Sequence, residues 1–163
     1  MSVNKHRPHV FVLPEDDANH AIATGFLLHP KLDLRSIQIL PNVGGWIKVR
    51  DQFQSEHVRL METYKNRHLI MLLDFDEKKN RREEITNDIP SHLLDRVFVM
   101  GVWSEPEELK KAGLGPLEKL GTQLACECEN DTRETWNHAL LRHNNFELER
   151  MALKIRTFLF PTH

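Results

Sequence analysis

The sequence lacks the features that mark several specialised classes of protein. It contains only two cysteines, Cys126 and Cys128, whose spacing fits neither a disulfide framework nor a zinc site. No apolar run approaches the roughly 18 residues of a membrane-spanning helix, and residues 1–8 contain no apolar signal core. The formal net charge is only −2, which argues against a general nucleic-acid coat but leaves room for a local basic strip. We therefore expect a cytoplasmic protein that does not enter a membrane.

The overall composition of the chain is that of an ordinary globular domain. Hydrophobic residues make up 40% of the chain and charged residues 28%, and both fractions are typical of a globular fold. A length of 163 residues is enough for one domain with a complete core. No repeat, low-complexity segment or linker divides the chain, so we predict a single domain over residues 1–163.

Short apolar runs predict buried β-strands. They occupy residues 9–13, 36–40, 68–73 and 96–100. The segments between them have apolar residues at helical spacing, and strands that alternate with helices form parallel sheets with right-handed crossovers. The sequence therefore predicts an α/β core of about four parallel strands over residues 9–113.

The rest of the chain shows only helical periodicity. Three apolar stripes predict three helices, built on Leu117, Leu120, Leu124 and Cys128, then on Trp136, Ala139, Leu140 and His143, then on Leu148, Met151, Ala152, Ile155, Phe158 and Leu159. Asn144 and Glu147 are spaced as a capping box between the last two helices. Before these stripes, Ser104 and Pro106 predict the entry of a helix with a serine cap. We expect a helical C-terminal extension over residues 116–160.

Carboxylates follow the first and third predicted strands. Glu15 follows the first strand, and Asp74 and Asp76 follow the third. Because the carboxyl ends of parallel strands meet at one edge of a sheet, Glu15 is expected to approach both aspartates. The aspartates are two residues apart and share one side if the strand geometry continues. Such oxygen ligands suit Mg²⁺ or Mn²⁺, so we predict a metal site formed by Glu15, Asp74 and Asp76, with a solvated acidic turn as the alternative.

Asp16 and Asp17 have a simpler explanation. Either one is a natural N-cap for the helix that follows the first strand, where a negative charge also suits the helix dipole. Glu15 precedes the cap, so capping does not explain it. A glutamate that faces metal-binding aspartates offers a general acid or base beside the metal.

A short basic strip follows the aspartate pair. Its cations are Lys78, Lys79, Arg81 and Arg82. Such a run is commonly the solvated start of a helix, but beside two aspartates it can also contact phosphates. We predict that these residues contact the backbone of a nucleic acid, DNA or RNA. In the C-terminal portion, the Arg142-His143-Asn144 cluster is the polar group that could fold back over the acidic edge.

The order of these motifs resembles the TOPRIM domain of topoisomerases, primases, OLD-family nucleases and small RNA-maturation nucleases. In that family a glutamate follows strand one and an Asp-x-Asp motif follows strand three, as Val12-Leu13-Pro14-Glu15 and Leu72-Leu73-Asp74-Phe75-Asp76 do here. The similarity covers residues 9–113 and implies a Rossmann-like TOPRIM core. The chain departs from the family at Asp16, which replaces a glycine after the glutamate, and at Lys79, where a second glycine is frequent.

The resemblance implies an activity as well as a fold. It implies phosphodiester hydrolysis, or a related phosphoryl transfer, on nucleic acid with Mg²⁺ or Mn²⁺ as cofactor. Glu15 would be the general acid or base close to the metal, and Asp74 and Asp76 would be metal ligands.

Two alternatives stay open. A TOPRIM-like shell without activity would be a binding or regulatory module with a protein partner or a second copy of itself. A receiver-like domain would use Asp74 as a phosphoacceptor, with Asp16 and Asp17 beside the Mg²⁺ and Ser104 as the switch hydroxyl. Against the receiver, the sequence has no convincing Lys-Pro pair after a fifth strand.

Overall fold

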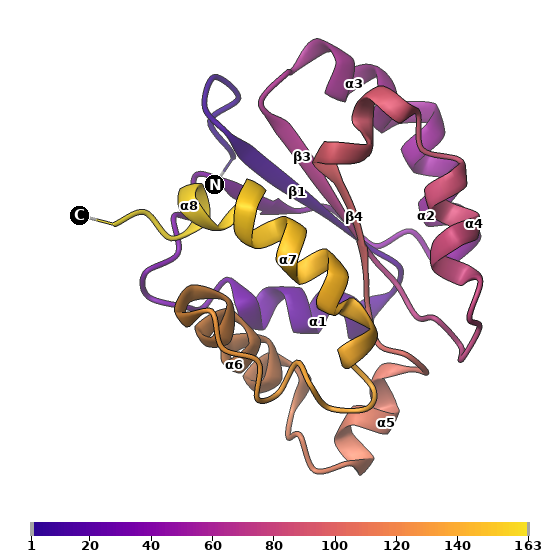
Figure 1. The fold of residues 1–163 in the computed structure, drawn as a ribbon, viewed down its shortest axis with the longest axis vertical. Coiled ribbons are helices and arrows are strands. Elements are labelled where there is room, and N and C mark those ends of the chain that lie inside the picture. Colours follow the sequence, from indigo (N-terminus) through magenta and orange to yellow (C-terminus); the bar gives the residue numbers. More distant parts are fainter. Residues whose placement is uncertain (1, 163) are drawn as a thin grey trace.

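The computed structural model describes residues 2–162 and contains a four-stranded sheet (Figure 1). Its strands are β1 (His9–Pro14), β2 (Ile37–Ile39), β3 (Arg67–Leu72) and β4 (Val97–Met100), in the spatial order β2-β1-β3-β4. All neighbouring strands are parallel. The prediction of a Rossmann-like α/β core with about four parallel strands is confirmed.

Helices cover both faces of the sheet (Figure 1). On one face lie α1 (Asp17–Phe26), α6 (Leu117–Asn130), α7 (Asn145–Lys154) and α8 (Arg156–Leu159), and on the other lie α2 (Trp46–Gln52), α3 (Val58–Thr63) and α4 (Arg81–Asn87). The strands alternate accordingly, so that Val10 and Val12 face the first layer while Phe11 and Leu13 face the second. Burial on both faces explains why the strands are continuous apolar runs in the sequence.

Short elements complete the connections. A π-helical turn (Phe53–His57) joins α2 to α3, a 3₁₀ segment (Ser91–Arg96) leads into β4, and α5 (Pro106–Lys111) lies between β4 and α6. None of the helices within residues 2–162 combines the length and the apolar character that crossing a membrane requires.

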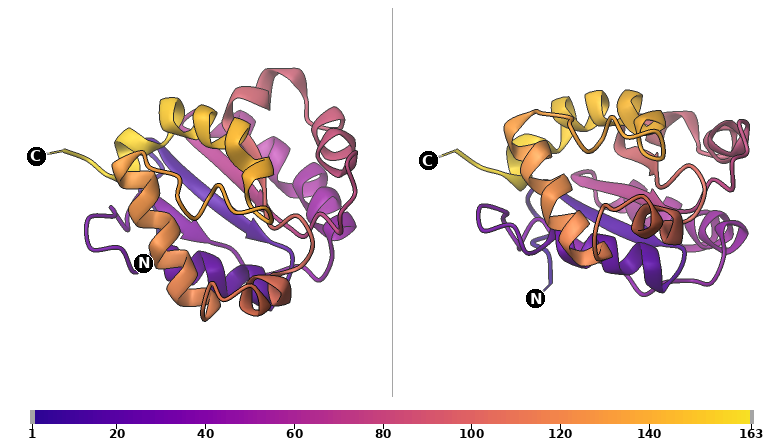
Figure 2. Two further views of the ribbon diagram at one scale, coloured as in Figure 1. Left: turned by 60° about the horizontal axis from the view of Figure 1, so that its bottom comes forward. Right: turned by 90° about the horizontal axis from the view of Figure 1, so that it is seen from below.

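The helix predicted around residues 136–143 is wrong. After α6, Asp131 adopts a left-handed conformation with φ 57°, and the chain continues as turns up to a short 3₁₀ segment at Arg142–Asn144 (Figure 2). Glu127, buried in α6, accepts hydrogen bonds from the backbone nitrogens of Thr135 (2.8 Å) and Trp136 (3.3 Å). Because this carboxylate accepts from the backbone nitrogens of the turn, the segment needs no helical hydrogen bonds there. Its apolar side chains therefore reach the core without a helix.

Two of the predicted caps do not form the expected side-chain hydrogen bonds. The helix after Ser104 starts at Pro106, but Glu105 occupies its N-cap position. Asn144 does occupy the N-cap position of α7, as its spacing predicted, but its side chain makes no cap hydrogen bond to that helix. It bonds to Gly101 instead, so a tertiary partner replaces the local one that the spacing suggested.

Side chains form hydrogen bonds with the backbone groups at the outer edge of β4. Asn144, Glu147 and Arg150 are three residues apart, so one side of α7 follows this strand edge. Their partners are the backbone groups of Gly101 (2.8 and 3.1 Å), Val99 (2.7 Å) and Val97 (3.2 Å), in that order. An edge strand normally offers unpaired backbone groups to other chains, and here these contacts occupy them.

Candidate metal centre

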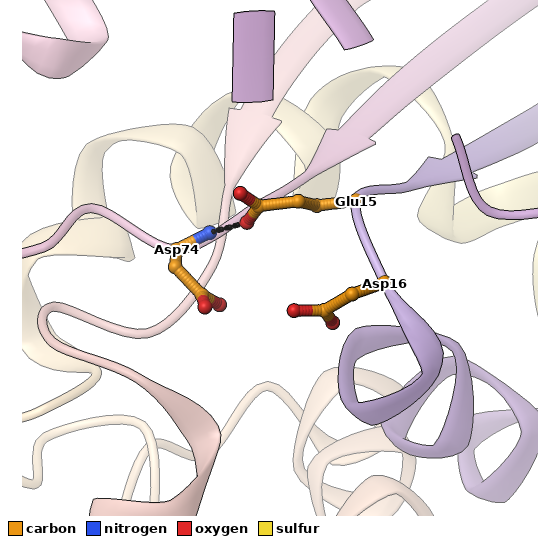
Figure 3. Close-up of side chains that lie close together, drawn as sticks. All are labelled: Glu15, Asp16 and Asp74. Carbon is orange, nitrogen blue, oxygen red and sulfur yellow. Dashed lines mark hydrogen bonds between the residues drawn. The ribbon is translucent and has the colours of Figure 1, made fainter. Parts of the chain in front are cut away.

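The C-terminal ends of β1 and β3 bring three carboxylates together (Figure 3). The two strands are paired in register up to Pro14 opposite Leu72, so Glu15 and Asp74 follow adjacent strand ends. Asp16 is next in the chain, at the start of α1. Ligand atoms of Glu15, Asp16 and Asp74 all lie within 4.8 Å of one another. The predicted approach of Glu15 to Asp74 is confirmed, and the group is chemically able to hold a metal ion.

Hydrogen bonds hold these carboxylates in place. Glu15 is buried, and its Oε2 accepts a hydrogen bond of 2.6 Å from the backbone nitrogen of Asp74 (Figure 3). Asp16 is the N-cap of α1, with extended backbone and an Oδ1 that accepts from the Asn19 nitrogen at 2.9 Å. The predicted capping role is therefore confirmed for Asp16, and the same carboxylate also belongs to the acidic group.

Asn19 links two members of the acidic group. It is fully buried, and its Nδ2 donates to Oδ1 of Asp16 (2.9 Å) and to Oδ1 of Asp74 (2.8 Å). Its own Oδ1 is buried without a partner. Asn19 was not among the predicted site residues. The available signal was an asparagine on the inward side of α1, three positions after the cap.

Burial makes full ionisation of this group unfavourable. It raises the pKa of Asp74 to about 7; the hydrogen bond from Asn19 opposes the shift, and the charges of Glu15, Asp16 and Asp76 add to it. Burial also raises the pKa of Glu15, against the hydrogen bond from the Asp74 nitrogen. A cation at this position would favour the ionised carboxylates, because opposite charge lowers their pKa.

Replacing Asn19 by alanine is expected to lower the free energy of unfolding by about 1–2 kcal/mol at about pH 8, because two facing carboxylates lose their shared donor. The loss should be smaller at about pH 5, where protonation of Asp74 removes much of the repulsion. Urea denaturation at both pH values measures the effect. Asn42→Ala, which removes a bond to the exposed Asp17, is the control; an equal loss at both pH values for Asn19→Ala would contradict the role.

Asp76 lies outside the acidic group, contrary to the predicted Glu15, Asp74 and Asp76 site. β3 ends at Leu72, and the chain turns at Asp76, which has a φ of 49°. Its half-exposed carboxylate pairs with Arg81 at 3.0 Å. The strand geometry does not continue to Asp76, so Asp16 takes the third position that was predicted for Asp76.

The predicted basic strip divides into two parts. Arg81 is buried against the Trp46 ring, and its Nη1 donates to the Asp74 carbonyl (2.9 Å) as well as to Asp76. Arg82 is directed inward, and its guanidinium donates to the Val99, His143 and Asn144 oxygens. Both arginines therefore donate to oxygens of the protein itself. The prediction that Arg81 and Arg82 contact phosphates is corrected accordingly. Lys78 and Lys79 are exposed, and within residues 2–162 neither forms an ion pair.

The Arg142-His143-Asn144 cluster folds back onto the end of β4, beside the acidic edge. Nε2 of His143 lies 2.7 Å from the Gly101 carbonyl oxygen, and its ring packs against Phe75. Burial lowers the pKa of His143 to about 4, with the nearby Arg82 charge as a further cause. His143 is therefore neutral at neutral pH and supports the segment that carries Asp74. Arg142 is exposed.

Comparison with known proteins identifies no family model, no curated protein and no solved structure that matches the chain. The fold and the site define the class directly: an α/β protein with a parallel four-stranded sheet and an acidic group at the carboxyl ends of its central strands. The resemblance to TOPRIM domains stays a hypothesis based on motif order.

Proposed function

We propose that Glu15, Asp16 and Asp74 bind Mg²⁺ or Mn²⁺ and that the protein uses this centre for phosphodiester hydrolysis, or a related phosphoryl transfer, on nucleic acid. The observation that carries the proposal is the convergence of three carboxylates within 4.8 Å at the carboxyl ends of the two central strands, β1 and β3. Their donor atoms are all oxygens, which suits a hard divalent cation. The TOPRIM resemblance supports the same chemistry.

Each residue of the site has a defined part in this proposal. Asp16 and Asp74 hold the cation, which when bound supplies positive charge opposite a phosphoryl group. Glu15 is both a ligand and the proton-transferring group, because a carboxyl with a raised pKa holds a proton closer to neutral pH. Lys78 and Lys79, exposed after β3, contact phosphates of the substrate.

The receiver-like alternative fits the molecule less well. A receiver needs a lysine after a fifth strand, whereas the sheet formed by residues 2–162 ends at β4. Asn144, Glu147 and Arg150 occupy the edge where a fifth strand would pair. The non-catalytic alternative is a binding or regulatory module that has the same fold and no turnover.

Isothermal titration calorimetry of the wild type with Mg²⁺ and Mn²⁺ tests the metal site. Asp74→Asn is expected to weaken binding by about tenfold or more, because it removes a charged ligand. Asp76→Asn is the matched control and should stay within about twofold, since the structure places Asp76 outside the group. No binding by the wild type, or equal effects of the two variants, would refute the proposed centre.

An activity screen then distinguishes the hydrolytic function from the receiver-like and non-catalytic alternatives. Mn²⁺-dependent cleavage of DNA or RNA that is lost in Asp74→Asn and Glu15→Gln supports the hydrolytic function. Phosphorylation of Asp74 by acetyl phosphate identifies a receiver. Cation binding with neither reaction identifies a binding module.

A further inference from the structure

A basic face lies at the opposite end of the sheet from the acidic group. Residues 4–9, 33–36 and 64–68 lie side by side there: the Asn4 nitrogen donates to the Arg35 carbonyl (2.9 Å) and the His9 nitrogen to the Asn66 carbonyl (3.1 Å). The lysines and arginines of these segments are Lys5, Arg7, Arg35, Lys65 and Arg67, against the single carboxylate of Asp33. We call these five cations and their segments the basic face.

The cations of the basic face have no acidic partners. Within residues 2–162 none of the five takes part in an ion pair, whereas Arg81 and Arg150 elsewhere are both paired. All except Arg67 are exposed. In a chain with a net charge of −2, this face therefore has a local positive potential of its own.

Arg67 adds a buried charge to the same face. It is only 2% exposed; its Nε donates to His9 Nε2 at 3.0 Å, and its guanidinium lies over the rings of Phe11 (4.1 Å) and Tyr64 (4.6 Å). Burial lowers the pKa of Arg67 and that of His9, and the charges of Arg67 and Lys5 lower the His9 value further. A buried cation without a counter-charge is costly, so an external anion at this face would be favourable.

A groove runs beside the basic face. Arg7 and Arg35 line it together with Lys31, Arg156 and the aromatic ring of Phe158. Lys31 and Arg156 approach the carboxylates of Glu129 (3.4 Å) and Asp131 (3.8 Å), respectively. Arg7 and Arg35 are thus the unpaired cations of the groove, and the half-buried ring of Phe158 lines it beside His68, with 5.4 Å between the two ring centroids.

We propose that this groove binds single-stranded nucleic acid, with Arg7 and Arg35 on the phosphates and Phe158 against a base. Cations that follow a backbone beside an aromatic ring are the usual features of a single-strand site. A membrane fits less well, because these segments expose only one large apolar side chain, Leu34. The six residues of β1 place the groove roughly 20 Å from the acidic group. That the bound strand is also the substrate rests on the proposed function, whereas the binding itself does not.

Fluorescence anisotropy with labelled oligothymidylate and oligouridylate of about 20 nucleotides tests the proposal. The buffer contains a chelator, so the result does not depend on the metal centre, and NaCl is varied. Arg7→Ala/Arg35→Ala is expected to weaken binding about tenfold and to reduce the slope of log affinity against log salt by about 1.4, since two single-strand phosphate contacts are lost. Lys110→Ala/Lys119→Ala removes two exposed charges outside the groove and should leave both values unchanged.

Three results would overturn the proposal. They are an absence of oligonucleotide binding by the wild type, equal losses in the two double variants, and equal affinity for a duplex of the same length. Binding to phosphatidylserine vesicles without binding to oligonucleotides would assign the basic face to a membrane surface instead. Unchanged thermal unfolding of the arginine variant, which alters only exposed side chains, ensures that any loss reflects the groove.

Discussion

Replacement of Asn144 by alanine is expected to lower the free energy of unfolding by about 4 kcal/mol, the largest effect foreseen for one side chain. Asn144 is fully buried, and its amide bonds both the nitrogen and the carbonyl of Gly101, the Leu141 carbonyl and a donor of Arg82. Alanine leaves these buried groups without partners. Urea denaturation, with the m-value checked for two-state behaviour, measures the loss.

The same variant should also expose the edge of β4. With its outer backbone groups free, the strand becomes a template for other chains, so we expect increased association in light scattering. Asn145→Ala is the control, because the Asn145 side chain donates its hydrogen bond to the exposed Asn137. This substitution should lower the free energy of unfolding by less than about 1 kcal/mol. A small stability loss in Asn144→Ala, comparable to that of the control, would show that α7 does not hold this edge.

Asp74→Asn is expected to stabilise the metal-free protein by about 2 kcal/mol at about pH 8, after allowance for solvent screening of a partly exposed group. The pKa of Asp74 is about 7 in the native state against an ordinary value of 3.8. Between these values the native state binds more protons than the unfolded state, so this residue lowers stability as pH rises through that window. Asparagine cannot ionise, so the difference between variant and wild type should grow from near zero at about pH 4 to its maximum above about pH 7.

Other titrating groups do not obscure this measurement. His143 has the opposite effect, because its lowered pKa means that stability is lost as pH falls from 6.5 towards about 4. Both proteins contain His143, so its contribution cancels in the difference. Glu77→Gln, a neutralisation of an exposed neighbour, should show no such trend. A pH-independent difference between Asp74→Asn and wild type would contradict the partly buried acidic group, and Mg²⁺ should stabilise the wild type more than the variant.

The sheet could be predicted well because its signals are local. Each strand is buried on both faces, so its sequence is a continuous apolar run, and the alternation with helices implies parallel pairing. The order of strands then places residues after β1 and β3 at one edge, which was enough to pair Glu15 with Asp74. The helix predicted at residues 136–143 and the cap predicted at Asn144 had the right spacing, but tertiary hydrogen bonds replaced the local ones. Ser104 lies one residue before the actual N-cap, Glu105, and its hydroxyl is buried without a partner.

The sequence by itself determined the α/β class, the parallel strands and the meeting of Glu15 with Asp74, because periodicity and chain order specify these without reference to side-chain packing. Only the tertiary structure decided that Asp16 replaces Asp76, that Asn19 bridges the carboxylates, and that Arg81 and Arg82 are directed inward. Those outcomes depend on one turn after β3 and on which donors burial leaves within hydrogen-bonding reach. Such choices are made by packing in three dimensions, and residue spacing along the chain does not record them.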